Sequence, residues 1–72
     1  MSPVLTTREA HIHRLIAAGL SNYAIATQLR ISEKTVECHI NRLFSKLQLR
    51  PDNTSHRRVL ATIMYHQRER HF

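Results

Sequence analysis

The sequence predicts an all-α fold, a compact four-helix domain that spans residues 1–72 with loose ends at 1–5 and 68–72. Hydrophobic side chains recur every three or four residues in several segments, which is the period of an amphipathic helix. The 72 residues include one Gly and two Pro and contain no alternating run of β-branched residues. A chain of this length normally forms a single domain whose stability depends on a compact, mostly local core.

The composition indicates the kind of partner. A formal net charge of +6 favours an anionic partner, and nucleic acid is the commonest one. The lone cysteine, Cys38, excludes an internal disulfide and suits a reducing cytosol. No apolar run approaches the roughly 18 residues of a membrane span, and the start MSPVLTT is too short and polar for a signal peptide. We therefore expect a cytoplasmic location and no membrane partner.

The first expected helix runs from Thr7 to Ala18. The run Thr6-Thr7-Arg8-Glu9 has the form of a capping box, with Thr6 as the N-cap and Glu9 reaching back to it. Gly19 supplies the left-handed residue that ends the helix. Three apolar residues are expected to face the core: Ile12, Leu15 and Ile16.

Two further helices follow at close spacing. Ser21 is a suitable N-cap for a short helix from Tyr23 to Leu29, and Arg30-Ile31 forms a tight connection. Ser32 then caps a longer helix in the segment Ser32 to Leu49. Its apolar stripe consists of Val36, Ile40, Leu43, Phe44 and Leu47. Two helices joined by so short a turn predict a helix-turn-helix made of the second and third helices.

A last helix is expected to reach about Gln67. The turn cluster Arg50-Pro51-Asp52-Asn53 interrupts the third helix, and Asn53 or Ser55 can cap the next one. Its apolar residues cover a wide arc: Val59, Leu60, Ile63 and Met64. We expect one pair of them to face the core and the other pair to remain partly exposed.

Four ordered motifs give the chain a family resemblance. They are Leu5-Thr6-Thr7-Arg8-Glu9, Gly19-Leu20-Ser21-Asn22, Ile31-Ser32-Glu33-Lys34-Thr35-Val36 and Lys46-Leu47. Together they resemble the DNA-binding domain of the LuxR/FixJ/NarL class of regulators, also called GerE-like. The resemblance covers Leu5 to Leu49 and, more loosely, the last helix.

The resemblance implies sequence-specific double-stranded DNA binding by a bacterial transcription regulator, as a dimer on paired half-sites. The third helix would enter the major groove. Base edges would be contacted by Glu37, Cys38 and Asn41. Phosphates would be contacted by Asn22, Tyr23, Lys34, Thr35, Arg42 and Lys46. The last helix would form the dimer interface through Val59, Ile63 and Gln67. RNA polymerase is a further implied partner.

Four departures from the family pattern stand out. Tyr23-Ala24 replaces a common lysine-glutamate pair, so the second helix lacks a capping-box partner. Glu37 stands where many members have a basic residue; it can accept a hydrogen bond from cytosine but repels phosphate. Gln48 replaces the usual glycine, which predicts a strained or differently ended helix. The connection from Arg50 to His56 is longer than in many members.

Other functions are less favoured by the residues. His11 and His13 lie two apart on a helix and cannot share a metal ion, so the six histidines are interpreted as chance surface residues. An enzyme is disfavoured because no nucleophile-base pair, no paired carboxylates and no glycine-rich phosphate loop can be assembled from the sequence. No metal or cofactor is expected. The alternative is a helix-turn-helix used mainly for protein contact, as in a sigma-factor-like module that docks on polymerase. The chain could be a complete small regulator or the output domain of a two-component response regulator, and the sequence leaves both open.

Overall fold

A computed structural model describes residues 4–50 and 54–69, without the side chains of residues 54 and 55. These parts of the chain contain four helices and no strand: α1 (Thr7–Ala17), α2 (Asn22–Leu29), α3 (Glu33–Lys46) and α4 (Thr54–Glu69). The predicted all-α fold is therefore confirmed. A short turn joins α2 to α3, as a helix-turn-helix requires.

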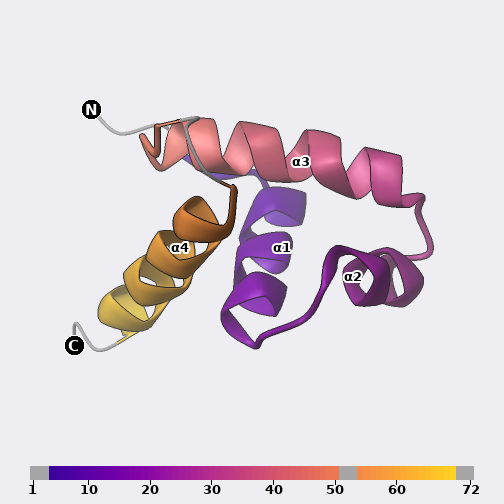
Figure 1. Cartoon of the computed structure of the whole chain (residues 1–72), viewed down its shortest axis with the longest axis horizontal. Helices are drawn as coiled ribbons and strands as arrows, with labels where there is room; N and C mark the ends of the chain where they lie inside the picture. The colour runs from indigo at the N-terminus through magenta and orange to yellow at the C-terminus, as the bar shows by residue number, and fades with distance from the viewer. Residues whose placement is uncertain (1–3, 51–53, 70–72) are drawn as a thin grey trace.

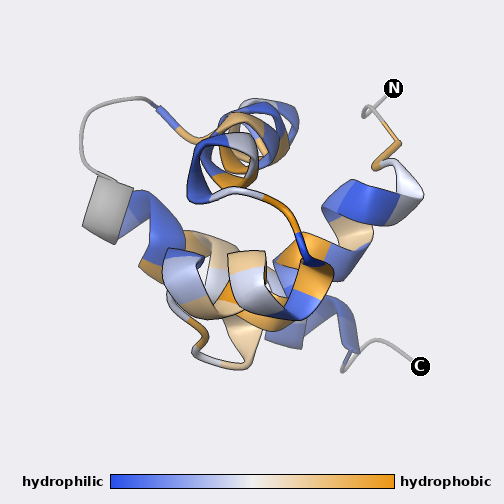
Figure 2. Ribbon diagram, turned by 90° about the vertical axis from the view of Figure 1, so that its right-hand side faces the viewer, coloured by the Kyte–Doolittle hydropathy of each residue, from blue (hydrophilic) through white to orange (hydrophobic). Residues whose placement is uncertain are grey.

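Three pairs of helices make the main contacts of the fold. α1 packs against both α3 and α4, whereas α2 packs mainly against α3. The other three helices all lie on the same side of α3, which forms one edge of the molecule (Figure 1). The hydrophobic parts of the helices turn toward the centre and the hydrophilic parts turn outward (Figure 2). The outer side of α3 is consequently not covered by any of the other three helices.

The apolar stripe predicted for α3 forms the centre of the core. Val36, Leu43 and Phe44 are completely buried, and Ile40 is 4% exposed. The inward residues predicted on α1 are also buried. Burying several large side chains in this way supplies most of the free energy that holds so small a domain together.

The contribution of α4 to the core differs in detail from the expectation. Ala61 is completely buried, although the sequence pattern did not single it out. Leu60 and Met64 are half-buried, whereas Val59 and Ile63 are exposed. A small residue at position 61 allows the backbone of α4 to approach α1 closely, so the larger neighbours lie at the margins of the contact. The expectation that one apolar pair stays exposed is confirmed.

Each of the first three helices begins at the predicted cap. The Thr6 hydroxyl accepts from Glu9 N at 3.1 Å, and Thr6 N donates to Glu9 Oε1 at 2.9 Å, which completes the capping box. Ser21 and Ser32 accept from the backbone amides of Ala24 and Thr35. These side chains satisfy amide groups that have no partner within the helix.

The same three helices end alike. In each, the residue after the last turn adopts a left-handed conformation, with φ of 91° at Gly19, 58° at Arg30 and 61° at Gln48. The following residue donates back to a carbonyl of the last turn, as Leu49 N does to Phe44 O at 3.0 Å. Gln48, which replaces the usual glycine, therefore does end its helix in a strained conformation.

Several helix ends differ from the sequence prediction. α1 stops at Ala17, and Ala18 serves as its C-cap. α4 begins at Thr54, so Ser55 lies inside the helix, while the other expected cap, Asn53, falls outside the described residues. α4 also continues to Glu69, through two residues that were expected to be loose.

The interpretation of every histidine as a surface residue is wrong for His13. Its side chain is 1% exposed, and its Nε2 lies 2.8 Å from the carbonyl oxygen of Ala61. Its ring also meets the ring of Tyr65 edge to face at 5.2 Å. Because α1 is covered by α3 on one side and by α4 on the other, its buried arc is wider than its apolar residues indicate. Burial lowers the pKa of His13.

Candidate nucleic-acid interface

The uncovered side of α3 carries the residues predicted to contact base edges. Glu37, Cys38 and Asn41 are all exposed and occupy successive turns of the helix. Cys38 has a free thiol. With a rise of about 1.5 Å per residue, α3 is roughly 21 Å long, and an α-helix of ordinary diameter fits the major groove of B-form DNA.

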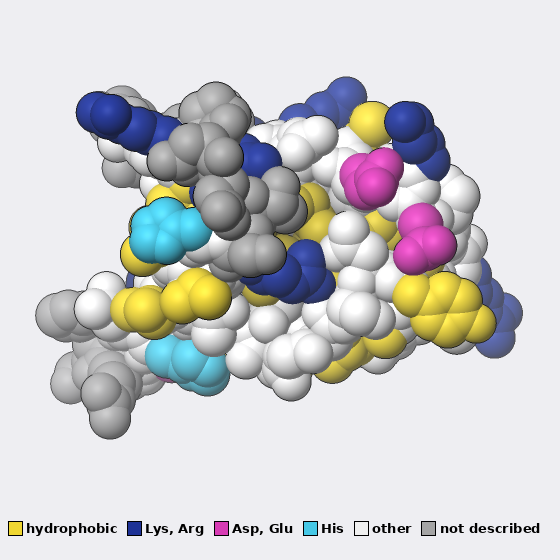
Figure 3. Space-filling view, in the orientation of Figure 1, with side chains coloured by type: hydrophobic (Ala, Val, Ile, Leu, Met, Phe, Trp, Pro, Cys, Tyr) yellow, Lys and Arg dark blue, Asp and Glu magenta, His cyan; other side chains and the backbone are white. Residues whose placement is uncertain are grey.

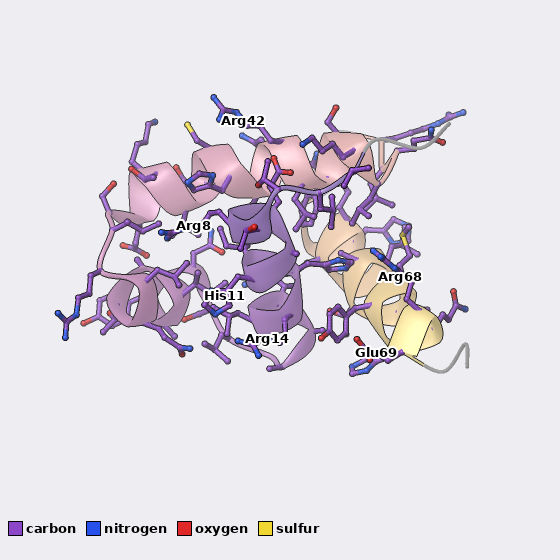
Figure 4. The ribbon with its side chains drawn as sticks, turned by 180° about the vertical axis from the view of Figure 1, so that it is seen from behind. Arg8, His11, Arg14, Arg42, Arg68 and Glu69 are labelled. Atoms are coloured by element: carbon purple, nitrogen blue, oxygen red, sulfur yellow. The ribbon has the colours of Figure 1, made fainter. Side chains whose placement is uncertain are left out.

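Some of the residues predicted to contact phosphates lie on α3 as well. Lys34, Thr35 and Arg42 are exposed. Arg42 projects from the outer side of α3, away from α1 and α4 (Figure 4). Lys and Arg side chains gather along the edge formed by α3, with acidic side chains close below them (Figure 3). The candidate interface is therefore bordered by Lys and Arg side chains. It is not uniformly basic, because Glu33 and Glu37 of α3 are also exposed.

The start of α2 presents two more residues of the predicted phosphate set. Tyr23 is 69% exposed, whereas Asn22 is half-buried. Asn22 Oδ1 accepts a hydrogen bond of 2.8 Å from Nη1 of Arg58 on α4. The other terminal nitrogen of Arg58, Nη2, donates to the backbone carbonyl of Leu20 in the turn before α2. A single guanidinium thus ties α4 to the first residue of the helix-turn-helix.

Lys46 is placed differently from the other predicted phosphate ligands. Its Nζ lies 2.7 Å from Oε1 of Glu9, whose side chain is only 4% exposed. Lys46 itself is 28% exposed and also approaches the backbone oxygen of Val4 at 3.4 Å. The hydrogen bonds from Lys46 and from Thr6 N lower the pKa of Glu9. The charge of Lys46 therefore has a partner within the domain, and its contact with phosphate stays a prediction.

The residues predicted for dimerisation share the outer face of α4. Val59, Ile63 and Gln67 are spaced four residues apart, and the first two are 57% and 46% exposed. Gln67 is exposed as well. Exposed apolar side chains in one row can bury one another against a second copy of the helix.

The arginines at the start of α4 were missed by reasoning from the sequence. Arg58 reaches residues 36 and 38 positions earlier in the chain. Arg57 stacks over the ring of Phe44, with the guanidinium carbon 5.1 Å from the ring centre. No local pattern predicts such contacts, because they depend on how α4 is docked.

Some positive charge lies away from α3. Arg8, His11 and Arg14 follow α1 on the face opposite to that of Figure 3 (Figure 4). Within residues 4–50 and 54–69, no group of three or more His, Cys, Asp or Glu side chains could hold a metal ion. No helix in the same two segments is long and apolar enough to cross a membrane.

Two helices joined by a tight turn, with an exposed polar face on the second, define a helix-turn-helix domain of the kind found in DNA-binding regulators. A family model described as bacterial regulatory proteins of the luxR family matches residues 3–64. The chain belongs to this family. Its members are DNA-binding transcription regulators rather than enzymes.

Individual relatives agree with this assignment. A nitrate/nitrite response regulator protein homolog from Haemophilus influenzae is 47% identical over 66 residues, covering 92% of this chain and 29% of the relative. The nitrate/nitrite response regulator proteins NarP and NarL of Escherichia coli are 47% and 43% identical, covering 89% and 88% of this chain. The chain spans 26–29% of the length of these three relatives.

Proposed function

We propose that this domain binds double-stranded DNA sequence-specifically, with α3 in the major groove, as part of a bacterial transcription regulator. The observation that carries the proposal is the exposed polar face of α3, which no other helix covers. Since DNA lies in the cytoplasm of a bacterium, the domain would act there. The relatives are response regulators, and we extend that role to this chain as an output domain.

One group of side chains would contact base edges and a second group would contact phosphates. Asn41 can form two hydrogen bonds to adenine, Glu37 can accept from the amino group of cytosine, and Cys38 can contact a thymine methyl group. Lys34, Thr35, Arg42, Asn22 and Tyr23 would hold the phosphates on either side. Because Lys46 is already paired with Glu9, we assign most of the phosphate attraction of α3 to Lys34 and Arg42.

Pairing would take place through α4. Val59 and Ile63 are the exposed large apolar side chains of this row, and Gln67 adds a polar one. So few apolar groups would bury well under the roughly 1,200 Å² of a stable dimer. Two half-sites on one duplex raise the effective concentration of each copy for the other. We therefore propose a monomer in free solution that pairs through α4 on DNA. Sedimentation of the domain alone and on a duplex with two half-sites would test this, and a stable dimer without DNA would contradict it.

Selection of bound duplexes from a random DNA pool tests the central proposal. The expected result is enrichment of one short motif, present in two copies at a fixed spacing. Variant Asn41→Ala should relax the preference at one position of that motif. If no sequence is enriched and binding disappears at moderate salt, the domain instead serves in protein contact, as a polymerase-docking module would.

A further inference from the structure

Arg58 occupies an unusual position for an arginine in a basic domain. Its side chain is half-buried between α4 and the turn that precedes α2. Its two terminal nitrogens donate to two different acceptors, the amide oxygen of Asn22 and the backbone oxygen of Leu20. The planar guanidinium reaches both from two separate nitrogens in a fixed fork, whereas the shorter side chain of a lysine has one nitrogen in place of the two. Arg58 is thus directed into the protein rather than toward a ligand.

This geometry determines which end of the Asn22 amide can face a phosphate. An asparagine side chain has an oxygen that accepts and an NH₂ group that donates. With Oδ1 held 2.8 Å from Nη1 of Arg58, the NH₂ group must point away from the guanidinium. Phosphate oxygens only accept hydrogen bonds, so an outward NH₂ attracts them and an outward oxygen repels them.

We propose that Arg58 is a positioning residue for DNA binding, which orients the Asn22 amide and the start of α2 so that Asn22 Nδ2 donates to a phosphate. The proposal rests on the proposed function, because it requires α2 to meet the DNA backbone. Arg58 acts through Asn22 and does not itself neutralise a phosphate. The first residue of α2 is held from α4, 36 positions further along the chain.

The test is a double-mutant cycle in DNA affinity, on a duplex obtained by the random-pool selection. Variants Asn22→Ala and Arg58→Lys, their combination and the parent would be titrated well below their melting temperatures, with folding checked by circular dichroism. Each single change should weaken binding about tenfold, the loss of one charge-assisted hydrogen bond. The double variant should be no weaker than either single variant, since both remove the same interaction.

Two comparisons separate positioning from simpler roles. The first is the slope of log affinity against log salt. Arg58→Lys keeps the positive charge, so its slope should equal that of the parent. If Arg58 contacted a phosphate directly, the slope of Arg58→Ala would instead be shallower by about one unit. Arg57→Lys is the matched control, because Arg57 stacks on Phe44. It should bind DNA like the parent.

Several results would overturn the proposal. One is parent-like affinity for Arg58→Lys, and another is a double variant in which the two single losses multiply to about a hundredfold. An equal loss of affinity in Arg57→Lys, or the shallower salt slope in Arg58→Ala, would overturn it as well. In each of these cases the parent still binds its duplex, so the proposed function stands. A parent that binds no duplex would reject the proposed function and this inference together.

Discussion

Lys46 Nζ lies 2.7 Å from Glu9 Oε1 and thereby ties the last turn of α3 to the first turn of α1, across 37 positions of sequence. The carboxylate is almost completely buried and also accepts from Thr6 N, so it serves as capping residue and ion-pair partner together. The end of the proposed recognition helix is thus fastened to the helix that carries the core. A change at Lys46 should affect stability as well as charge.

The first prediction concerns this ion pair. Lys46→Met keeps most of the side-chain volume but leaves a buried carboxylate without its cation, which should cost about 1–3 kcal/mol of unfolding free energy at pH 7. The additional change Glu9→Gln should restore part of the loss, because the unpaired charge is then gone. Urea unfolding of the four proteins measures the coupling. Equal stabilities throughout would mean that the pair contributes nothing.

The second prediction separates phosphate contact from base readout. Arg42→Ala should weaken binding to every sequence and make the salt slope shallower by about 0.9. Asn41→Ala should instead cost roughly 1–3 kcal/mol on the best site and leave the slope unchanged. Affinity titrations at several salt concentrations, on the best site and on a scrambled one, distinguish them. Uniform loss in Asn41→Ala would make it a positioning contact.

The third prediction compares a buried and an exposed aliphatic residue. Ile40 is 4% exposed within the core, so Ile40→Ala should cost about 2–5 kcal/mol. Val59 is 57% exposed on α4, so Val59→Ala should change stability by less than about 0.5 kcal/mol in the isolated domain. Thermal melts of both variants provide the comparison. Near-parental melting of Ile40→Ala would show that the α3 stripe is not the core.

The fourth prediction concerns the end of α3. Gln48 has a φ of 61°, a conformation that glycine adopts without strain. Gln48→Gly should therefore stabilise the domain by about 1 kcal/mol, which raises the melting temperature by about 4–8 °C. Gln28→Gly is the matched control: Gln28 lies within α2, where glycine should destabilise by up to about 1 kcal/mol. Equal effects of the two changes would contradict the strain argument.

The fifth prediction follows from the buried ring of His13. Burial, and secondly the nearby charge of Arg68, lower its pKa from the ordinary value of 6.5, although the hydrogen bond to Ala61 acts in the opposite direction. The unfolded chain then binds more protons than the folded one, so stability is full above about pH 6.5 and falls as the pH drops below it.

Chemical unfolding between pH 8 and pH 5 measures this effect. In His13→Gln the dependence in this range should be weaker, because the amide can still donate to Ala61 but does not titrate. His11→Gln, on the half-exposed side of α1, should retain the parental profile. An unaltered profile in His13→Gln would assign the pH dependence to other groups.

The sequence by itself determined those parts of the molecule that depend on neighbours three to five positions apart. The capping box of Thr6 and Glu9, the caps at Ser21 and Ser32, and the stripe through Val36 and Phe44 are all of this kind. The helix-turn-helix and its exposed polar face follow from them. Local hydrogen bonds and helical periodicity leave few other arrangements for these segments.

Only the tertiary structure decided how polar side chains pair across the domain. His13 meets Ala61 over 48 positions, Lys46 meets Glu9 over 37, and Arg58 meets Asn22 over 36. A charged or polar side chain that leaves water must find a partner, and which partner lies within reach depends on the docking of whole helices. The burial of His13 on α1 and the contacts of Arg58 with the start of α2 therefore emerge only when α4 is in place.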